Sequence, residues 1–160
     1  MGPNNPIKHH GIFLERIDKD RVLRLWSVIL YTQGKSKYKK DFPEIHFFKS
    51  NKKNTNYGEY YNNGNTIKIW WKDHGGILEL ARTMVHEYAH YLQFWPWYNR
   101  YTSIYGYENN PYEIQARDLE KIAPSLVELT RIDRWDEMIA EDRKLKRIYK
   151  KIKDTVTVEI

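Results

Sequence analysis

Hydrophobic and polar positions in the first half of the chain predict one helix followed by short strands. Hydrophobic residues recur at helical spacing over residues 13–33 and stop near Gly34, which predicts an N-terminal helix. Segment 43–50 is a short β-prone run, and Asn63-Gly64 is a strong hairpin-turn signal between two further runs. In the second of these runs, Ile67, Ile69 and Trp71 alternate with their neighbours, which predicts a half-exposed strand.

The second half of the chain is predicted to be mostly helical. Apolar residues cover most of the circumference of a helix over 77–95, so this helix should be central, and Pro96 should end it. The aromatic segment 95–110 is predicted to be a loop, and Asn110-Pro111 should cap and open the next helix. From Pro124 a further helix is expected to run to about residue 153, and the alternating tail 154–160 is predicted to form a strand.

This order of elements predicts an α+β fold. A small antiparallel or mixed sheet should pack on the central helix, with further helices following it. At 160 residues the chain is expected to form one domain, residues 1–160, with a basic C-terminal helix around 125–153.

The composition indicates a globular domain and excludes metal sites with cysteine ligands. The chain is 41% hydrophobic and 30% charged, which is typical of a globular domain. It contains no cysteine, so any metal must be held by histidines and carboxylates. No transmembrane segment and no signal peptide are apparent, so an intracellular (cytoplasmic) protein is expected.

Positive charge is concentrated near the C-terminus. The net charge is +6, and residues 143–153 alone carry seven basic and no acidic residues. Such a segment can contact nucleic acid or an acidic partner. The alternative is a solvated helix face that is balanced by the acidic residues just upstream.

The central helix contains candidate catalytic chemistry in the segment MVHEYAHY. His86 and His90 are one helical turn apart and lie about 40° from each other around the helix, so both can bind one ion. Glu87 points beside that ion, as a general base does in a zinc hydrolase with the H-E-x-x-H pattern. The alternative is a pair of core histidines satisfied by ordinary hydrogen bonds.

A catalytic zinc site usually has three protein ligands, so a third ligand must be sought. Glu113, on the first turn of the helix after Asn110, is the best candidate. The alternatives are two acidic residues, Glu108 and Glu120, and the upstream histidines His9, His10, His46 and His74.

The segments TMVHEYAHYLQ and NPYEIQARDLE together resemble the gluzincins, which are thermolysin-like zinc metallopeptidases, and their small single-domain members in particular. The resemblance implies Zn²⁺ bound by His86, His90 and Glu113, with Glu87 as general base. It also implies that the strand bearing Ile67, Ile69 and Trp71 binds an extended peptide as an upper edge strand.

The same resemblance implies two supporting roles. An acidic residue should orient a zinc-binding histidine, and Asp118 is the candidate. A tyrosine of the aromatic segment should stabilise the oxyanion; the candidates are Tyr98, Tyr101, Tyr105 and Tyr107, of which Tyr105 and Tyr107 are assigned to the catalytic site.

Taken together, these features predict a zinc-dependent peptidase, a hydrolase acting on protein or peptide substrates. The alternative function is a nucleic-acid- or protein-binding module that uses the basic C-terminal helix. In that case the zinc site would be structural or vestigial.

Overall fold

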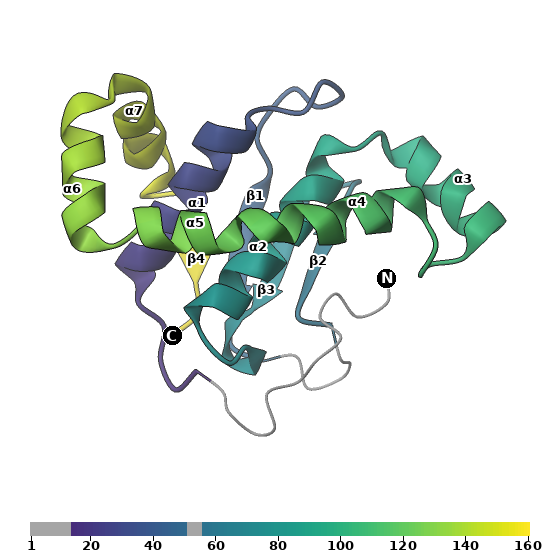
Figure 1. Ribbon diagram of the computed structural model, residues 1–160, viewed down its shortest axis with the longest axis horizontal. Helices are drawn as coiled ribbons and strands as arrows, with labels where there is room; N and C mark the ends of the chain where they lie inside the picture. Colours follow the sequence, from purple (N-terminus) through teal and green to yellow (C-terminus); the bar gives the residue numbers. More distant parts are fainter. Residues whose placement is uncertain (1–13, 51–55) are drawn as a thin grey trace.

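A four-stranded mixed sheet and a set of helices form the molecule (Figure 1). The computed structural model describes residues 14–50 and 56–160. The strands are β1 (Glu44–Phe48), β2 (Gly58–Tyr61), β3 (Thr66–Trp70) and β4 (Thr157–Val158). The α-helices are α1 (Lys19–Gln33), α2 (Ile77–Leu92), α3 (Trp95–Tyr105), α4 (Pro111–Leu119), α5 (Ala123–Leu129), α6 (Ile132–Glu141) and α7 (Arg143–Ile152), with short 3-10 turns at η1 (Trp71–Asp73) and η2 (Glu120–Ile122).

The strand order is β2-β3-β1-β4, which places β2 at one edge. Strand β1 pairs in parallel with both β3 and β4, whereas β2 pairs antiparallel with β3. The turn between β2 and β3 contains Asn65 at a φ of 45°, a conformation that asparagine tolerates better than most residues. The predicted hairpin at Asn63-Gly64 and the predicted C-terminal strand are therefore both confirmed.

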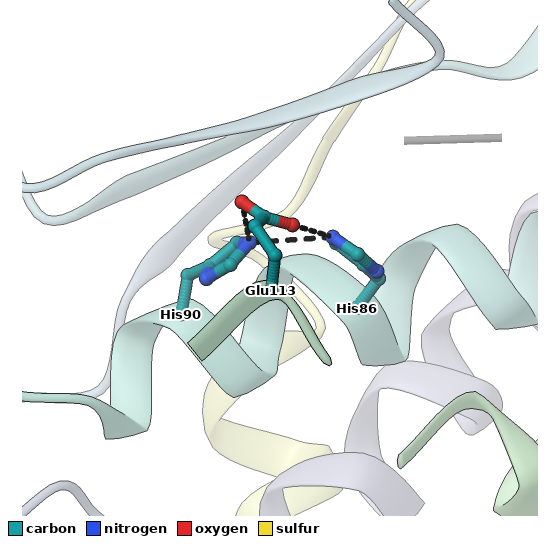
Figure 2. Close-up of side chains that lie close together, drawn as sticks. All are labelled: His86, His90 and Glu113. Carbon is teal, nitrogen blue, oxygen red and sulfur yellow. Dashed lines mark hydrogen bonds and ion pairs between the residues drawn. The ribbon is translucent and has the colours of Figure 1, made fainter. Parts of the chain in front are cut away.

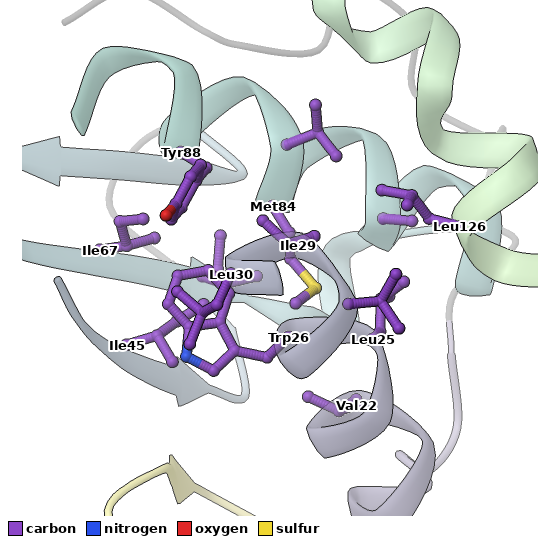
Figure 3. Close-up of a cluster of buried hydrophobic side chains, with 14 of the residues drawn as sticks. Val22, Leu25, Trp26, Ile29, Leu30, Ile45, Ile67, Met84, Tyr88 and Leu126 are labelled. Carbon is purple, nitrogen blue, oxygen red and sulfur yellow. The ribbon is translucent and has the colours of Figure 1, made fainter. Parts of the chain in front are cut away.

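One hydrophobic core joins the sheet to α1 and α2 (Figure 3). Ile45 and Ile67 point from the strands toward Trp26 of α1, and the Trp26 ring meets Tyr88 of α2 edge-on at 5.5 Å between centroids. Helix α2 is buried from Leu80 to Tyr91 except at Arg82. This confirms the prediction that this helix is central, but the helix ends at Leu92 and not at residue 95, and Pro96 belongs to the next helix.

The aromatic segment after α2 is a helix and not the predicted loop. Pro96 lies in the first turn of α3, where its missing N–H costs no hydrogen bond. Gly106, at a φ of 78°, ends this helix. The proline and the glycine of this segment therefore mark the two ends of a helix.

The predicted continuous helix over 125–153 is also wrong, because the segment forms three helices, α5, α6 and α7. The first break is fixed to α1, where Arg24 Nε donates to Thr130 O at 3.0 Å. At the second break, the Asp142 carboxylate accepts hydrogen bonds from the backbone N–H groups of Lys144 and Leu145 and so caps α7. These side-chain contacts replace the helical hydrogen bonds that are lost at each break.

The α+β class with a small mixed sheet is confirmed. The N-terminal helix begins at Lys19, later than residue 13, because the Asp18 side chain caps it by accepting from Arg21 N. None of the helices in residues 14–50 and 56–160 has both the length and the apolar character of a membrane span.

Candidate metal centre

Helices α2 and α4 bring three predicted metal ligands together. His86 and His90 lie on one side of α2, and Glu113 reaches them from the first turn of α4 (Figure 2). Asn110 fixes the start of α4 by accepting a hydrogen bond from Tyr112 N, and its amide donates to Tyr98 O. Asn110 therefore starts α4 and also links its first turn, which carries Glu113, to α3.

The three side chains face one another at short distances inside the protein. Glu113 Oε1 lies 3.0 Å from His86 Nε2, and Glu113 Oε2 lies 3.1 Å from His90 Nε2. The two Nε2 atoms are 3.2 Å apart, and all three side chains are at most 1% exposed. Each can offer one ligand atom within 4.8 Å of the others.

The outer nitrogen of each imidazole has its own acceptor. His86 Nδ1 lies 2.8 Å from Glu120 Oε2, and His90 Nδ1 lies 2.8 Å from Gln93 Oε1. The Gln93 amide nitrogen donates to Tyr112 O and to Gln115 Oε1, so its oxygen must face His90. Both Nδ1 atoms are therefore protonated, so each ring, when neutral, presents its Nε2 lone pair to the centre.

This arrangement fits a cation. With both rings neutral, two Nε2 lone pairs and the Glu113 carboxylate would face one another at about 3 Å, and a positive charge at the centre, either a proton or a metal ion, relieves that repulsion. A nitrogen, nitrogen and oxygen donor set with hydrogen-bonded outer nitrogens is the usual environment of a zinc ligand set. The buried group could therefore bind a metal ion.

The carboxylates around the centre also shift the pKa values of its own side chains. Burial lowers the pKa of His86, but hydrogen bonds to Glu113 and Glu120 outweigh it and raise that pKa to about 10. Burial opposes ionisation of Glu113, yet hydrogen bonds to His86 and His90 hold its pKa well below the usual range. The centre thus favours an anionic carboxylate facing positive charge.

Glu87 lies next to the ligands and is completely buried. Among the described residues, neither of its carboxylate oxygens has a hydrogen-bond partner. Burial raises the pKa of Glu87 to about 7. A buried carboxylate without a partner is costly, so Glu87 is a candidate functional group beside the centre.

Two tyrosines border the centre, and only one of them was assigned to it from the sequence. The Tyr98 hydroxyl donates to Glu113 Oε2, and its ring stacks on Trp95 at 4.5 Å between centroids. Burial and the carboxylates of Glu113 and Glu87 raise the pKa of Tyr107, which places it beside the centre. Tyr105 is 52% exposed and its ring contacts Tyr101, so the structure does not bring it to the site.

Other predicted residues lie away from the centre. Asp118 is exposed and pairs with Lys121, so its assignment beside a histidine is wrong and Glu120 occupies that position. Glu108 is exposed, and His46 pairs with Glu44. His74 is buried between Trp70 O and Thr83 Oγ1, whereas His9 and His10 lie outside the described residues.

The predicted substrate strand is not at an edge of the sheet. Strand β3 lies between β2 and β1, and Ile67, Ile69 and Trp71 are at most 2% exposed because they face the core. Their assignment as substrate-binding residues is wrong. The edge strand is β2, and a Cβ added at Gly58 would lie 3.3 Å from Glu87 Cγ, so β2 passes close to the site.

Helical periodicity in the sequence could have identified Glu120 and Gln93, the partners of the two histidines. Glu120 follows Glu113 by two helical turns and therefore lies on the same side of the helix, whereas Asp118 is rotated by about 140°. Gln93 follows His90 by three residues, which also places it on one side of α2. Tyr98 had no such signal, because α3 was predicted to be a loop.

The buried group of His86, His90 and Glu113 is the main chemical feature of the described structure. No protein-family model, curated protein or solved structure matches this chain.

Proposed function

We propose that this protein is a zinc-dependent peptidase of gluzincin type. One observation carries the proposal: an unpartnered, buried Glu87 carboxylate adjoins a buried His86–His90–Glu113 group. A metal-holding triad alone would also suit a structural site. The neighbouring unpaired base favours catalysis.

The donor set favours zinc among the common metals. His86 and His90 would supply two imidazole nitrogens, and Glu113 would supply a carboxylate oxygen. Zinc held there supplies Lewis acidity, which lowers the pKa of water toward about 7 and polarises a carbonyl group.

Glu87 is the proton carrier in this proposal. Its pKa of about 7 lies close to neutral pH, so the carboxylate can take a proton from the attacking water and release it again. The proton then passes to the amine nitrogen that leaves when the peptide bond breaks. Burial strengthens both transfers, because few water molecules compete for the proton.

A peptide substrate is favoured by the position of β2. This strand is at the edge of the described sheet, and a Cβ added at its residue Gly58 would lie 3.3 Å from Glu87 Cγ. An extended peptide could add to this edge through backbone hydrogen bonds. Its scissile bond would then lie near the proposed base.

The tyrosines have separate roles in this proposal. Tyr98 holds the Glu113 carboxylate in place through its hydroxyl hydrogen bond. Tyr107, beside both Glu113 and Glu87, is the better candidate to donate to the developing oxyanion. The variant Tyr107→Phe should therefore lower kcat while the bound zinc stays unchanged.

The variant Glu87→Gln tests the proposal. Removing the base without changing its size should preserve bound zinc and the fold but abolish cleavage of unfolded casein, with a loss of about 100-fold or more. Zinc content is measured by atomic absorption, and cleavage by release of soluble peptides. Full activity in Glu87→Gln would contradict the mechanism, as would wild-type protein that binds zinc but cleaves no protein.

A further inference from the structure

Helix α7 presents an unusual concentration of positive charge at one end of the molecule. Figure 1 places α6 and α7 at the end opposite to α3, with α7 beside α1. The helix has the sequence RKLKRIYKKI, and its lysine and arginine side chains are all exposed. We call these outward side chains of α7 the basic surface.

The apolar side of α7 is fixed, so the basic surface has a defined orientation. Leu145 and Ile152 are buried in the core, and the Tyr149 ring meets Trp135 of α6 edge-on at 5.1 Å. Asp142 caps the helix and accepts a hydrogen bond from Tyr31 of α1 at 2.5 Å. The ten residues of α7 therefore hold their charges along a rigid line of about 15 Å.

The cations of the basic surface form no ion pair among the described residues, although Lys144 lies over the Tyr31 ring and near Asp142. In the described part of the chain, the ion pairs of arginine and lysine involve Arg82, Lys121 and Arg131, and none involves α7. The acids of α6 are exposed, and Asp133 pairs with Arg131 instead. A rigid row of unpaired cations costs electrostatic free energy that an anionic partner would offset.

A second basic segment approaches α7 from the loop after α1. Residues 35–40 contain four lysines, and Lys35 lines a cavity of about 310 Å³ together with Lys151 of α7. Asp41 and Glu44 line the same cavity, so the uninterrupted positive charge is on the outer side of α7.

We propose that the basic surface binds the phosphate backbone of a nucleic acid, independently of its sequence. Phosphates form a regular line of single negative charges, which suits a rigid row of lysine and arginine side chains. A membrane surface fits less well, because no large apolar side chain projects among the outward cations. This inference goes beyond the peptidase proposal and needs no metal.

The test compares the full-length wild type with Lys146→Gln/Arg147→Gln/Lys150→Gln. These three side chains are exposed and make no described ion pair, so the substitutions should leave the fold intact, which circular dichroism checks. The matched control is Lys19→Gln/Lys49→Gln/Lys72→Gln, which removes the same charge from exposed positions elsewhere that make no described ion pair. Binding of a mixed-sequence DNA duplex is measured by fluorescence anisotropy at about 50 to 200 mM salt.

Wild-type protein should bind the duplex, with an affinity that falls steeply as salt rises. The α7 variant should bind at least about tenfold more weakly with a shallower salt slope, while the control should match the wild type. Absence of wild-type binding at low salt, or equal losses in both variants, would overturn the inference. Equally tight binding to polyglutamate or to anionic vesicles would overturn the assignment to nucleic acid.

Discussion

The two histidines of the candidate metal centre have unlike partners. His86 donates from Nδ1 to the carboxylate of Glu120, whereas His90 donates to the amide oxygen of Gln93. A carboxylate makes the imidazole a stronger ligand than an amide does, because it stabilises positive charge on the ring. His86 should therefore be the more strongly binding ligand of the pair.

Substitution of Glu120 tests how much its contact with His86 contributes to zinc binding. Glu120→Ala should weaken zinc affinity by about 10- to 100-fold, because it removes the acceptor that orients His86. Glu120→Gln keeps an acceptor oxygen and should restore much of that loss. Zinc affinity is measured by competition with a chromogenic chelator.

The matched control is Asp118→Ala, which removes an exposed carboxylate two residues before Glu120, at the end of α4. Its zinc affinity should equal that of the wild type. A loss in Asp118→Ala as large as that in Glu120→Ala would show that general charge, and not the contact with His86, is responsible.

Burial of His74 makes the free energy of unfolding depend on pH. Its Nδ1–H donates to Trp70 O at 2.9 Å, and its Nε2 accepts from Thr83 Oγ1 at 2.8 Å, so the neutral ring is fully satisfied. Burial lowers the pKa of His74 from 6.5 to about 4. Between these two values the unfolded chain binds a proton that the folded chain does not.

The free energy of unfolding should therefore fall as pH decreases from about 6.5 to about 4. The contribution of His74 is on the order of 3 kcal/mol over this interval, and it is constant below it. Urea denaturation across this range should give a shallower pH dependence for His74→Asn than for the wild type. Identical pH slopes would contradict the assignment, because the other titrating groups are common to both proteins.

At the residue scale, local periodicity correctly placed His86 and His90 on one side of α2 with Glu87 next to them. The i and i+4 spacing of His86 and His90 places them on one side of any helix, so no tertiary information was needed. Tyr98 was named only as one of four oxyanion candidates, and its contact with Glu113 was not predicted, nor was the role of Gln93, because both depend on how α3 and α4 pack against α2.

At the scale of elements, the closest approach in the site is between strand β2 and helix α2. A Cβ at Gly58 would lie 2.6 Å from Thr83 Cγ2 and 3.0 Å from Ile69 Cδ1. Glycine is thus required where the edge strand passes over the helix.

Gly58→Ala should push β2 away from α2. We expect it to lower the free energy of unfolding by about 1–3 kcal/mol, as overpacked cores do, and to reduce peptide cleavage. Gly64→Ala is the control, because a Cβ there meets only Thr66 Oγ1 at 3.5 Å. Urea denaturation of the two variants should separate them, and equal stabilities would contradict the close approach of β2 to α2.

Elements with a strong local signal were predicted, and those decided by tertiary contacts were not. The apolar period of α2 and the Asn63-Gly64 turn are both local signals, and both elements formed. The order of strands depends on contacts between residues far apart in the sequence. Strand β3 is internal because it pairs with β2 on one side and in parallel with β1 on the other. The breaks between α5, α6 and α7 likewise depend on contacts with α1 that no pattern within the segment contains.

At the scale of the whole molecule, two chemically distinct regions occupy different parts of the fold. The candidate metal centre lies between α2 and α4, and the basic surface is on α7 beyond α1 (Figure 1). Because the two regions share no side chain, substitutions in one should leave the other unchanged. The peptidase and nucleic-acid proposals can therefore fail separately.

The ligand set of the metal centre is tested most directly by anomalous diffraction from crystals of the protein grown with zinc. We expect one strong peak at the zinc absorption edge, about 2.0–2.2 Å from His86 Nε2, His90 Nε2 and a carboxylate oxygen of Glu113. A dominant peak at other residues, or zinc bound by the two histidines with Glu113 turned away, would contradict the account.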